Sequence, residues 1–120
     1  MSRIAYVNGR YRPHRDATVH IEDRGYQFSD GVYEVCEVMG GRLVDVRRHM
    51  ERLQRSLAAL RIRLPMTLNA LSVVLHETIR RNRVDWGIVL SGASSRLRRA
   101  FPNFGIRPRF RAAWFSRIMH

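Results

Sequence analysis

Apolar and polar residues alternate with two different periods along this chain, and each period predicts a different kind of element. Val32, Cys36 and Val38 fall at even positions of a segment that ends at Met39, which predicts a strand with one buried face. From Val46 to Leu60 the apolar residues recur at spacings of three and four, and a similar stripe follows residue 67. These two segments are expected to be amphipathic helices. We therefore expect an α+β domain in which antiparallel strands pack with two helices.

Glycine-containing turns separate the short strands. Ile4–Val7 and Arg10-Tyr11 flank Asn8-Gly9, a pair that readily adopts the positive φ angles of a two-residue hairpin turn. The chain is therefore expected to open with a short hairpin. Gly40-Gly41 is a second turn signal. Further short strands are expected over residues 19–21, 42–44 and 87–90.

Each predicted helix is preceded by a residue that can cap it. Asp45 is positioned to cap the first helix and Thr67 the second, because their side-chain oxygens can accept from the free N–H groups of the first turn. The expected buried stripe of the first helix is Val46, Met50, Leu53, Leu57 and Leu60. The expected stripe of the second is Leu68, Leu71, Val74, Leu75 and Thr78.

Size and composition limit the class of protein. The 120 residues fit one domain, and their apolar content of 45% is ordinary for a globular chain. The apolar runs are too short to span a membrane, and the N-terminus lacks the apolar segment of a secretory signal. The single cysteine, Cys36, excludes an internal disulfide and makes a cytoplasmic location the default expectation. On its strand we expect it to be a buried, inert thiol.

The charge is strongly positive and is carried by arginine alone. The net charge is +12, all 22 basic residues are arginine, and the chain contains no lysine. Ten arginines lie between residues 80 and 120, against one acid, Asp85. Such a cluster can bind a polyanion, or it can reflect arginine used throughout in place of lysine. Because no nucleic-acid-binding motif accompanies the charge, we expect no nucleic-acid partner.

The five histidines give no sign of a metal centre. None forms a His-x-x-x-His pair or lies beside a cysteine at the spacing that zinc ligands require. No metal site is therefore expected.

Two motifs together resemble a known family. The residues from Glu22 to Val35 read Glu-Asp-Arg-Gly-Tyr-Gln-Phe-Ser-Asp-Gly-Val-Tyr-Glu-Val. They resemble the signature near the start of the fold-type IV pyridoxal-phosphate aminotransferases, most closely the D-amino-acid transaminases. The segment His49-Met50-Glu51-Arg52-Leu53 is similar to the His-x-x-Arg-Leu helix of the same family. The resemblance implies that Tyr33 faces the cofactor and substrate and that Arg52 binds the cofactor's phosphate. Asp30 and Glu34 belong to the same signature; we interpret Asp30 mainly as a turn residue before Gly31 and assign no catalytic role to Glu34.

The resemblance also implies an activity. The intact family moves an amino group from a D-amino acid such as D-alanine to a 2-oxo acid, and we expect it to act as a homodimer. Branched-chain aminotransferases and aminodeoxychorismate lyases share its fold and stay as alternatives, as does a non-catalytic basic binding module.

The absence of lysine conflicts with that activity. The family holds its cofactor as a Schiff base on a lysine of its second domain. We therefore expect residues 1–89 to be the N-terminal domain of such an enzyme and 90–120 to be a divergent arginine-rich tail. The lysine-bearing domain is expected to be absent and the chain to be inactive alone. The resemblance is interrupted after Val89 and resumes at Ala100-Phe101-Pro102, which suggests local frame shifts in the coding sequence.

Overall fold

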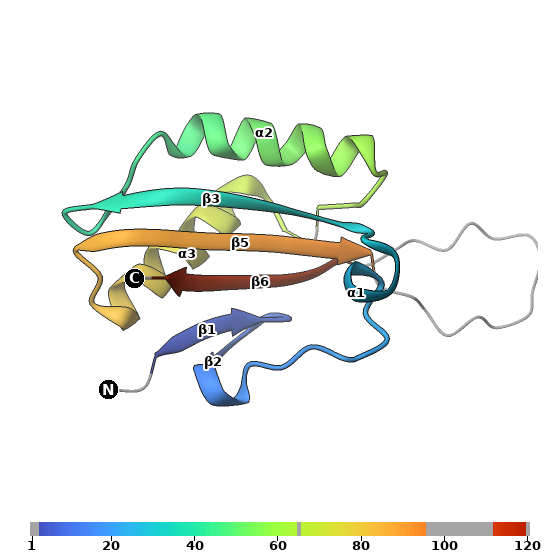
Figure 1. The fold of residues 1–120 in the computed structure, drawn as a ribbon. Coiled ribbons are helices and arrows are strands. Elements are labelled where there is room, and N and C mark those ends of the chain that lie inside the picture. The colour runs from blue at the N-terminus through green and yellow to red at the C-terminus, as the bar shows by residue number, and fades with distance from the viewer. Residues whose placement is uncertain (1–2, 65, 96–111, 120) are drawn as a thin grey trace, which may run out of the picture.

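A six-stranded antiparallel sheet with two helices on one face forms the structure (Figure 1). The computed structural model of the chain describes residues 3–64, 66–95 and 112–119, the last of these as backbone. The strands lie in the order β2-β1-β6-β5-β3-β4. The elements are β1 (Ile4–Val7), β2 (Arg10–Pro13), η1 (His14–Asp16), α1 (Arg24–Phe28), β3 (Gly31–Met39), β4 (Arg42–Leu43), α2 (Val46–Ala59), α3 (Leu68–Asn82), β5 (Trp86–Ser95) and β6 (Ala112–Met119). No helix of the described residues is long and apolar enough to cross a membrane.

The expected N-terminal hairpin is confirmed. β1 pairs antiparallel with β2, and Val7 lies opposite Arg10. Asn8 and Gly9 form the turn with φ angles of 50° and 89°. A two-residue turn of this kind matches the twist of the flanking strands, which is why the Asn-Gly pair specifies it.

The strand expected over residues 19–21 is absent, and the prediction was wrong. Residues 17–20 have no regular structure, and Ile21 is exposed. Two alternating apolar residues are too few to specify a strand, because a strand also needs a neighbour to pair with. The segment that follows contains a short helix. Asp23 accepts a hydrogen bond from the Gly25 N–H at 2.9 Å and begins the short helix α1.

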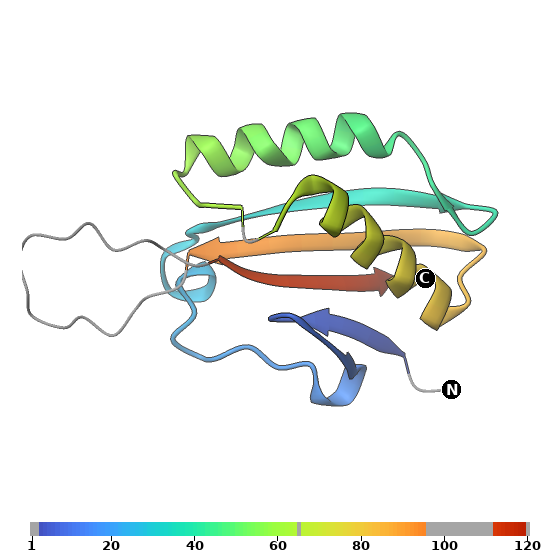
Figure 2. The same cartoon turned by 180° about the vertical axis from the view of Figure 1, so that it is seen from behind.

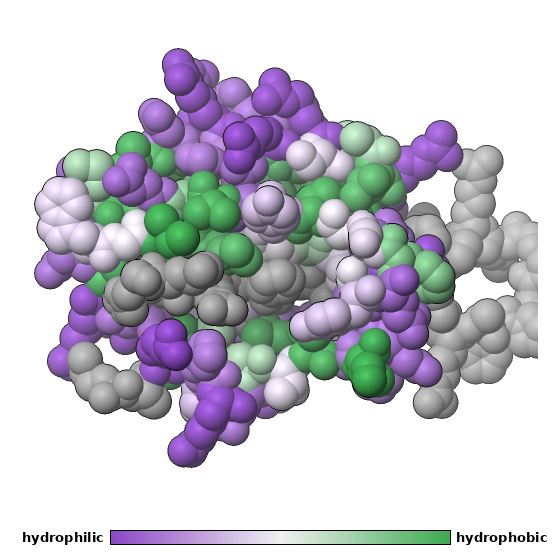
Figure 3. Space-filling view, in the orientation of Figure 1, coloured by the Kyte–Doolittle hydropathy of each residue, from purple (hydrophilic) through white to green (hydrophobic). Residues whose placement is uncertain are grey.

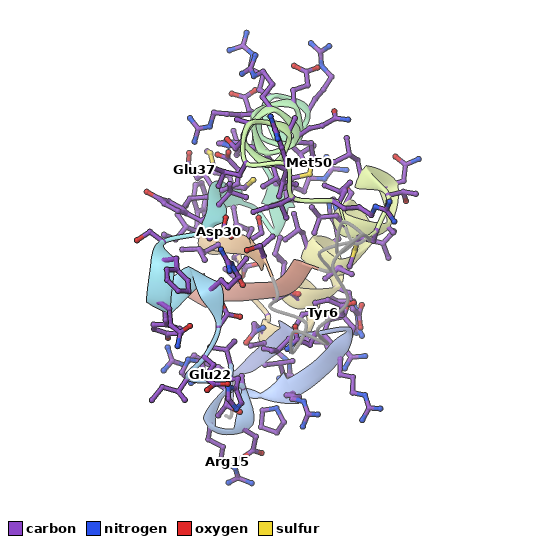
Figure 4. The ribbon with its side chains drawn as sticks, turned by 90° about the vertical axis from the view of Figure 1, so that its right-hand side faces the viewer. Tyr6, Arg15, Glu22, Asp30, Glu37 and Met50 are labelled. Atoms are coloured by element: carbon purple, nitrogen blue, oxygen red, sulfur yellow. The ribbon has the colours of Figure 1, made fainter. Side chains whose placement is uncertain are left out.

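Helix α2 packs on the sheet through a stripe that is shorter than expected. Met50, Leu53 and Leu57 are buried, and Figure 4 shows Met50 between α2 and the rest of the molecule. Leu60, predicted to belong to the stripe, is 45% exposed because the helix ends at Ala59. The predicted cap was also wrong. Asp45 has a left-handed backbone (φ 51°) and makes no side-chain cap bond, because capping requires the extended conformation.

Helix α3 follows the prediction closely. Thr67 caps it by accepting from the Ala70 N–H at 3.1 Å. Its buried side chains are Leu71, Leu75, Thr78 and Ile79. At its end Asn82 accepts from the Ile4 N–H and donates to the Ile4 carbonyl oxygen, both at 2.9 Å. The helix is thereby attached to β1, on the face of the sheet seen in Figure 2.

The strand expected over residues 87–90 is longer than predicted. β5 runs from Trp86 to Ser95, and it pairs with β3 from Trp86 to Ser94 and with β6 on the other side. Residues 90–95 and 112–119, expected to belong to a divergent tail, are therefore strands of the same sheet. The family-like residues at 100–102 lie outside the described residues.

The sheet face opposite α2 and α3 carries exposed apolar side chains. The space-filling view of this face shows apolar residues gathered over β3 and β5, whereas α2 is covered by polar ones (Figure 3). Met39 and Trp86 lie opposite one another across the two strands, and both are exposed. The packed core thus lies on one side of the sheet.

Candidate functional site

Strand β3 directs its successive side chains to opposite faces of the sheet. Glu34, Cys36 and Val38 face the helices and are buried, whereas Tyr33 is 70% exposed on the other face. Cys36 confirms the expected buried thiol. Burial and the nearby Glu34 carboxylate raise its pKa to about 11, so it is protonated at neutral pH.

Glu34 is the centre of a charged cluster that joins β3 to α2. The side chain is 1% exposed. The Arg52 Nε donates to its Oε2 at 2.9 Å, and the Arg52 Nη2 donates to its Oε1. The His49 Nδ1 lies 2.9 Å from the same Oε1. His49 and Arg52 are three residues apart on α2, so they fall on one side of the helix and reach the carboxylate together.

Glu34 is ionised at neutral pH. Burial by itself raises the pKa of Glu34, but the hydrogen bonds and charges of Arg52 and His49 outweigh it and hold the pKa below the usual value. An ionised carboxylate only accepts, so the His49 Nδ1 is the donor in its bond to Oε1. The hydrogen bonds that Arg52 donates to Glu34, the charge of that carboxylate and, more weakly, the nearby Tyr33 raise the pKa of Arg52. The guanidinium is therefore a fixed positive charge.

One edge of the Arg52 guanidinium is bound, and the other is exposed. Its Nε and Nη2 are bound to Glu34, yet 63% of the side chain is exposed. Among the described residues Nη1 donates to no side chain or carbonyl oxygen. The arginine thus has a bound edge toward the sheet and an open edge toward solvent.

A second polar cluster fixes the beginning of β3. Arg24 Nε donates to Asp30 Oδ2 at 2.9 Å and to Ser95 Oγ at 3.1 Å, and Ser95 Oγ also donates to Asp30. Burial alone raises the pKa of Asp30, but these hydrogen bonds lower it overall. Figure 4 shows Asp30 where the α1 segment meets the sheet. Asp30 therefore does more than form a turn, because it joins α1 to β5.

An open pocket of about 630 Å³ lies beside Tyr33. It is lined by side chains from β1, from the 14–29 segment, and from the neighbouring ends of β3 and β5. Val7, Val19, Tyr26 and Val32 make much of it apolar, with His14 as one of its polar groups.

The two site residues expected from the sequence are neighbours, but they do not share a wall of this pocket. Tyr33 lines the pocket, whereas Arg52 does not. Glu34 connects them, because it follows Tyr33 on β3 and binds Arg52. Sequence reasoning missed Glu34 and His49. The available signal was a glutamate at an inward position of an apolar strand, together with the His-x-x-Arg spacing on one helix face. No group of three or more His, Cys, Asp or Glu within the described residues is arranged to hold a metal ion.

The sequence is similar to those of known aminotransferases. A profile of the family described as Amino-transferase class IV matches residues 31–105. The chain is 39% identical over 83 residues to the D-alanine aminotransferase of Listeria innocua, which covers 69% of this chain and 29% of that protein. It is 34% identical over 107 residues to the D-alanine aminotransferase of Staphylococcus epidermidis, covering 86% of this chain and 38% of that protein.

Solved structures share the fold. A branched-chain aminotransferase from Thermoproteus uzoniensis with norvaline has a TM-score of 0.79 at 23% identity, over 99% of this chain and 41% of that one. A branched-chain amino acid aminotransferase from Escherichia coli has a TM-score of 0.83 at 15% identity, over 99% of this chain and 41% of that one. Identities this low show the fold alone, and they confirm the expected α+β architecture of an N-terminal aminotransferase domain.

The chain thus spans less than half the length of each of these proteins. The family profile nevertheless covers more than half of the 120 residues and includes both Tyr33 and Arg52. This chain belongs to the class IV aminotransferase family.

Proposed function

We propose that this chain carries the phosphate-binding side of an aminotransferase that moves an amino group from a D-amino acid to a 2-oxo acid, with pyridoxal phosphate as cofactor. The observation that carries the proposal is Arg52, whose guanidinium is held by a buried carboxylate on one edge and exposed on the other. The family resemblance assigns the cofactor's phosphate to this arginine. The relatives described as D-alanine aminotransferases support the D-amino acid as substrate. A cytoplasmic homodimer is part of the same proposal.

The donor set at this place suits a phosphate monoester. A guanidinium is a planar, permanently charged fork of N–H donors, which matches phosphate oxygens. Tyr33 adds an exposed phenol that can donate to or accept from a bound ligand. When bound, pyridoxal phosphate supplies the electron sink for amino transfer. None of the 120 residues is a lysine, so no side chain here offers the amine to which the family joins its cofactor. The residues thus fit the phosphate, and they do not fit the covalent attachment.

The remaining roles follow from position. Arg52 binds and orients the phosphate, and Tyr33 orients the ligand from the opposite side of β3. The pocket beside Tyr33 has a volume within the usual range of small-molecule sites, and its apolar lining excludes part of the water around a bound amino acid.

The proposal is tested by titrating the 120-residue chain with pyridoxamine phosphate, which has no aldehyde and cannot form an imine with the N-terminus. Binding is followed by the phosphorus NMR signal. We expect Arg52→Ala to weaken binding by about tenfold or more, because a charge-assisted hydrogen bond is lost. Arg55→Ala is the matched control, since Arg55 is an exposed arginine one turn further along α2. Equal losses in the two variants would mean general charge attraction, and the assignment would then fail.

A further inference from the structure

Glu34 is not explained by packing. It lies on the buried face of β3 together with Cys36 and Val38, where an apolar side chain would suit the core. A buried carboxylate is costly unless donors surround it. Here α2 supplies three donor groups, namely Nε and Nη2 of Arg52 and Nδ1 of His49, and both carboxylate oxygens accept. Position 34 therefore holds a buried negative charge, and Arg52 is its strongest partner.

The contact with Glu34 fixes the direction in which Arg52 points. Two bonds from one planar guanidinium to one carboxylate define the plane of the group and its rotation. The remaining Nη1 then lies on the far side of the guanidinium carbon, away from the strand. Because 63% of the side chain is exposed, this edge is open to a ligand.

A fixed arginine binds an anion with a smaller loss of entropy than a free one. A long side chain that is mobile before binding loses rotamer freedom when a ligand immobilises it. In the folded protein the contact with Glu34 has already removed this rotamer freedom from Arg52. The carboxylate also lowers the net positive charge close to a bound phosphate. The arrangement therefore improves the orientation of Arg52 and weakens its charge attraction for the phosphate.

We propose that Glu34 is a positioning residue, which holds the Nε edge of Arg52 so that the opposite edge faces the phosphate of the cofactor. This inference rests on the proposed function, since it takes a phosphate as the ligand of Arg52.

The decisive variant is Glu34→Gln in the full 120-residue chain. Glutamine keeps the size of the side chain, but it accepts through one oxygen only and carries no charge. The substitution adds one positive unit to the protein, so general electrostatics predicts tighter phosphate binding. Our inference predicts the opposite, a loss of about twofold to tenfold for pyridoxamine phosphate, as expected when a side chain must be immobilised on binding. Glu37→Gln is the matched control, because Glu37 is exposed on the same strand and its loss changes the net charge equally.

A second readout follows the arginine itself. The Arg52 Nε–H signal in a proton–nitrogen NMR spectrum is identified by its loss in Arg52→Ala. In the wild-type chain we expect this proton to exchange with water more slowly than that of exposed Arg55, because it is bound to a buried carboxylate. Glu34→Gln should remove the difference, and Glu37→Gln should leave it unchanged.

The outcomes separate the two proposals. If Arg52→Ala weakens binding but Glu34→Gln leaves it unchanged or strengthens it, the positioning role is refuted and the proposed function stands. If Arg52→Ala has no effect on binding in the first place, both fail. Should Glu34→Gln not fold, the wild-type exchange rates decide, since an Arg52 Nε–H that exchanges as fast as that of Arg55 contradicts the positioning role by itself.

Discussion

The helix that carries Arg52 depends on one fully buried leucine, and its removal gives a quantitative test of the fold. Leu53 is 0% exposed and is the middle one of the three buried side chains of α2. Replacing a buried leucine by alanine costs about 2–5 kcal/mol, and the cost is larger where the surroundings cannot collapse. Met50 and Leu57 flank the site on the same helix face and prevent collapse, so we expect Leu53→Ala to lower the free energy of unfolding by about 3 kcal/mol.

Leu60, the residue directly after α2, offers the same substitution with much less burial. It is 45% exposed and lies at the end of α2. Removing a half-exposed side chain forfeits roughly half of a transfer free energy of about 1.5–3 kcal/mol, so Leu60→Ala should cost at most about 1.5 kcal/mol. The comparison thus isolates burial, because the residue type and the replacement are the same in both variants.

Urea unfolding followed by far-UV circular dichroism measures both values. For a small domain the free energy of unfolding falls by about 1–3 kcal/mol per molar urea, so the expected change for Leu53→Ala moves the midpoint by about 1–3 M. Similar midpoints for Leu53→Ala and Leu60→Ala would contradict the packing of α2 on β3. The place of Arg52 beside Glu34 would then lose its structural basis.

Three further predictions concern charge and cysteine chemistry. The pKa values of Glu34 and Asp30 lie below their usual 4.5 and 3.8. The stability that these two ionised carboxylates add to the fold is therefore complete above 4.5 and 3.8, and it is lost as the pH falls through their lower pKa values in the folded protein. The urea midpoint should therefore fall as the pH is lowered below about 4.5, the ordinary pKa of a glutamate, and it should fall less in Glu34→Gln; a pH-independent midpoint would contradict the two clusters. Cys36 is 1% exposed with its pKa raised to about 11, so we expect no reaction with a thiol reagent at pH 8 until urea unfolds the chain, and rapid labelling of the native protein would refute its burial. Because the chain has no lysine, treatment with pyridoxal phosphate and borohydride should label no side chain, and a mapped side-chain adduct would overturn this expectation.

Local sequence patterns predicted the elements whose partners lie nearby in the chain. The Asn8-Gly9 hairpin and the Thr67 cap need only residues within a few positions, and both are as expected. Asp45 has a side-chain oxygen that could cap a helix, as Thr67 does. It comes directly after the β3–β4 hairpin, however, and its own backbone is left-handed. The preceding turn therefore determines the backbone conformation of Asp45, which the capping preference of a single residue cannot predict.

Features that depend on distant residues were not predictable in the same way. Glu34 interrupts an apolar strand, and its partners His49 and Arg52 come from another element. Period and composition predict which face of a strand is buried, but they do not predict which side chain of a later helix will neutralise a charge there. The family resemblance pointed to Arg52 and Tyr33, and although Glu34 belongs to the same signature it was given no role.

The place of β6 within the sheet also affects how the chain can fold. Tyr6 pairs with Ser116 and Val7 with Phe115, contacts that join residues about 110 positions apart. During synthesis the β1–β2 hairpin emerges before the other described strands, yet the strand that connects it to β5 follows all of them in the sequence. Until β6 inserts, β1 and β5 each present an unpaired edge, and such edges promote association between chains. We therefore expect the interval before residue 119 emerges to be the period in which the nascent chain most needs protection from aggregation.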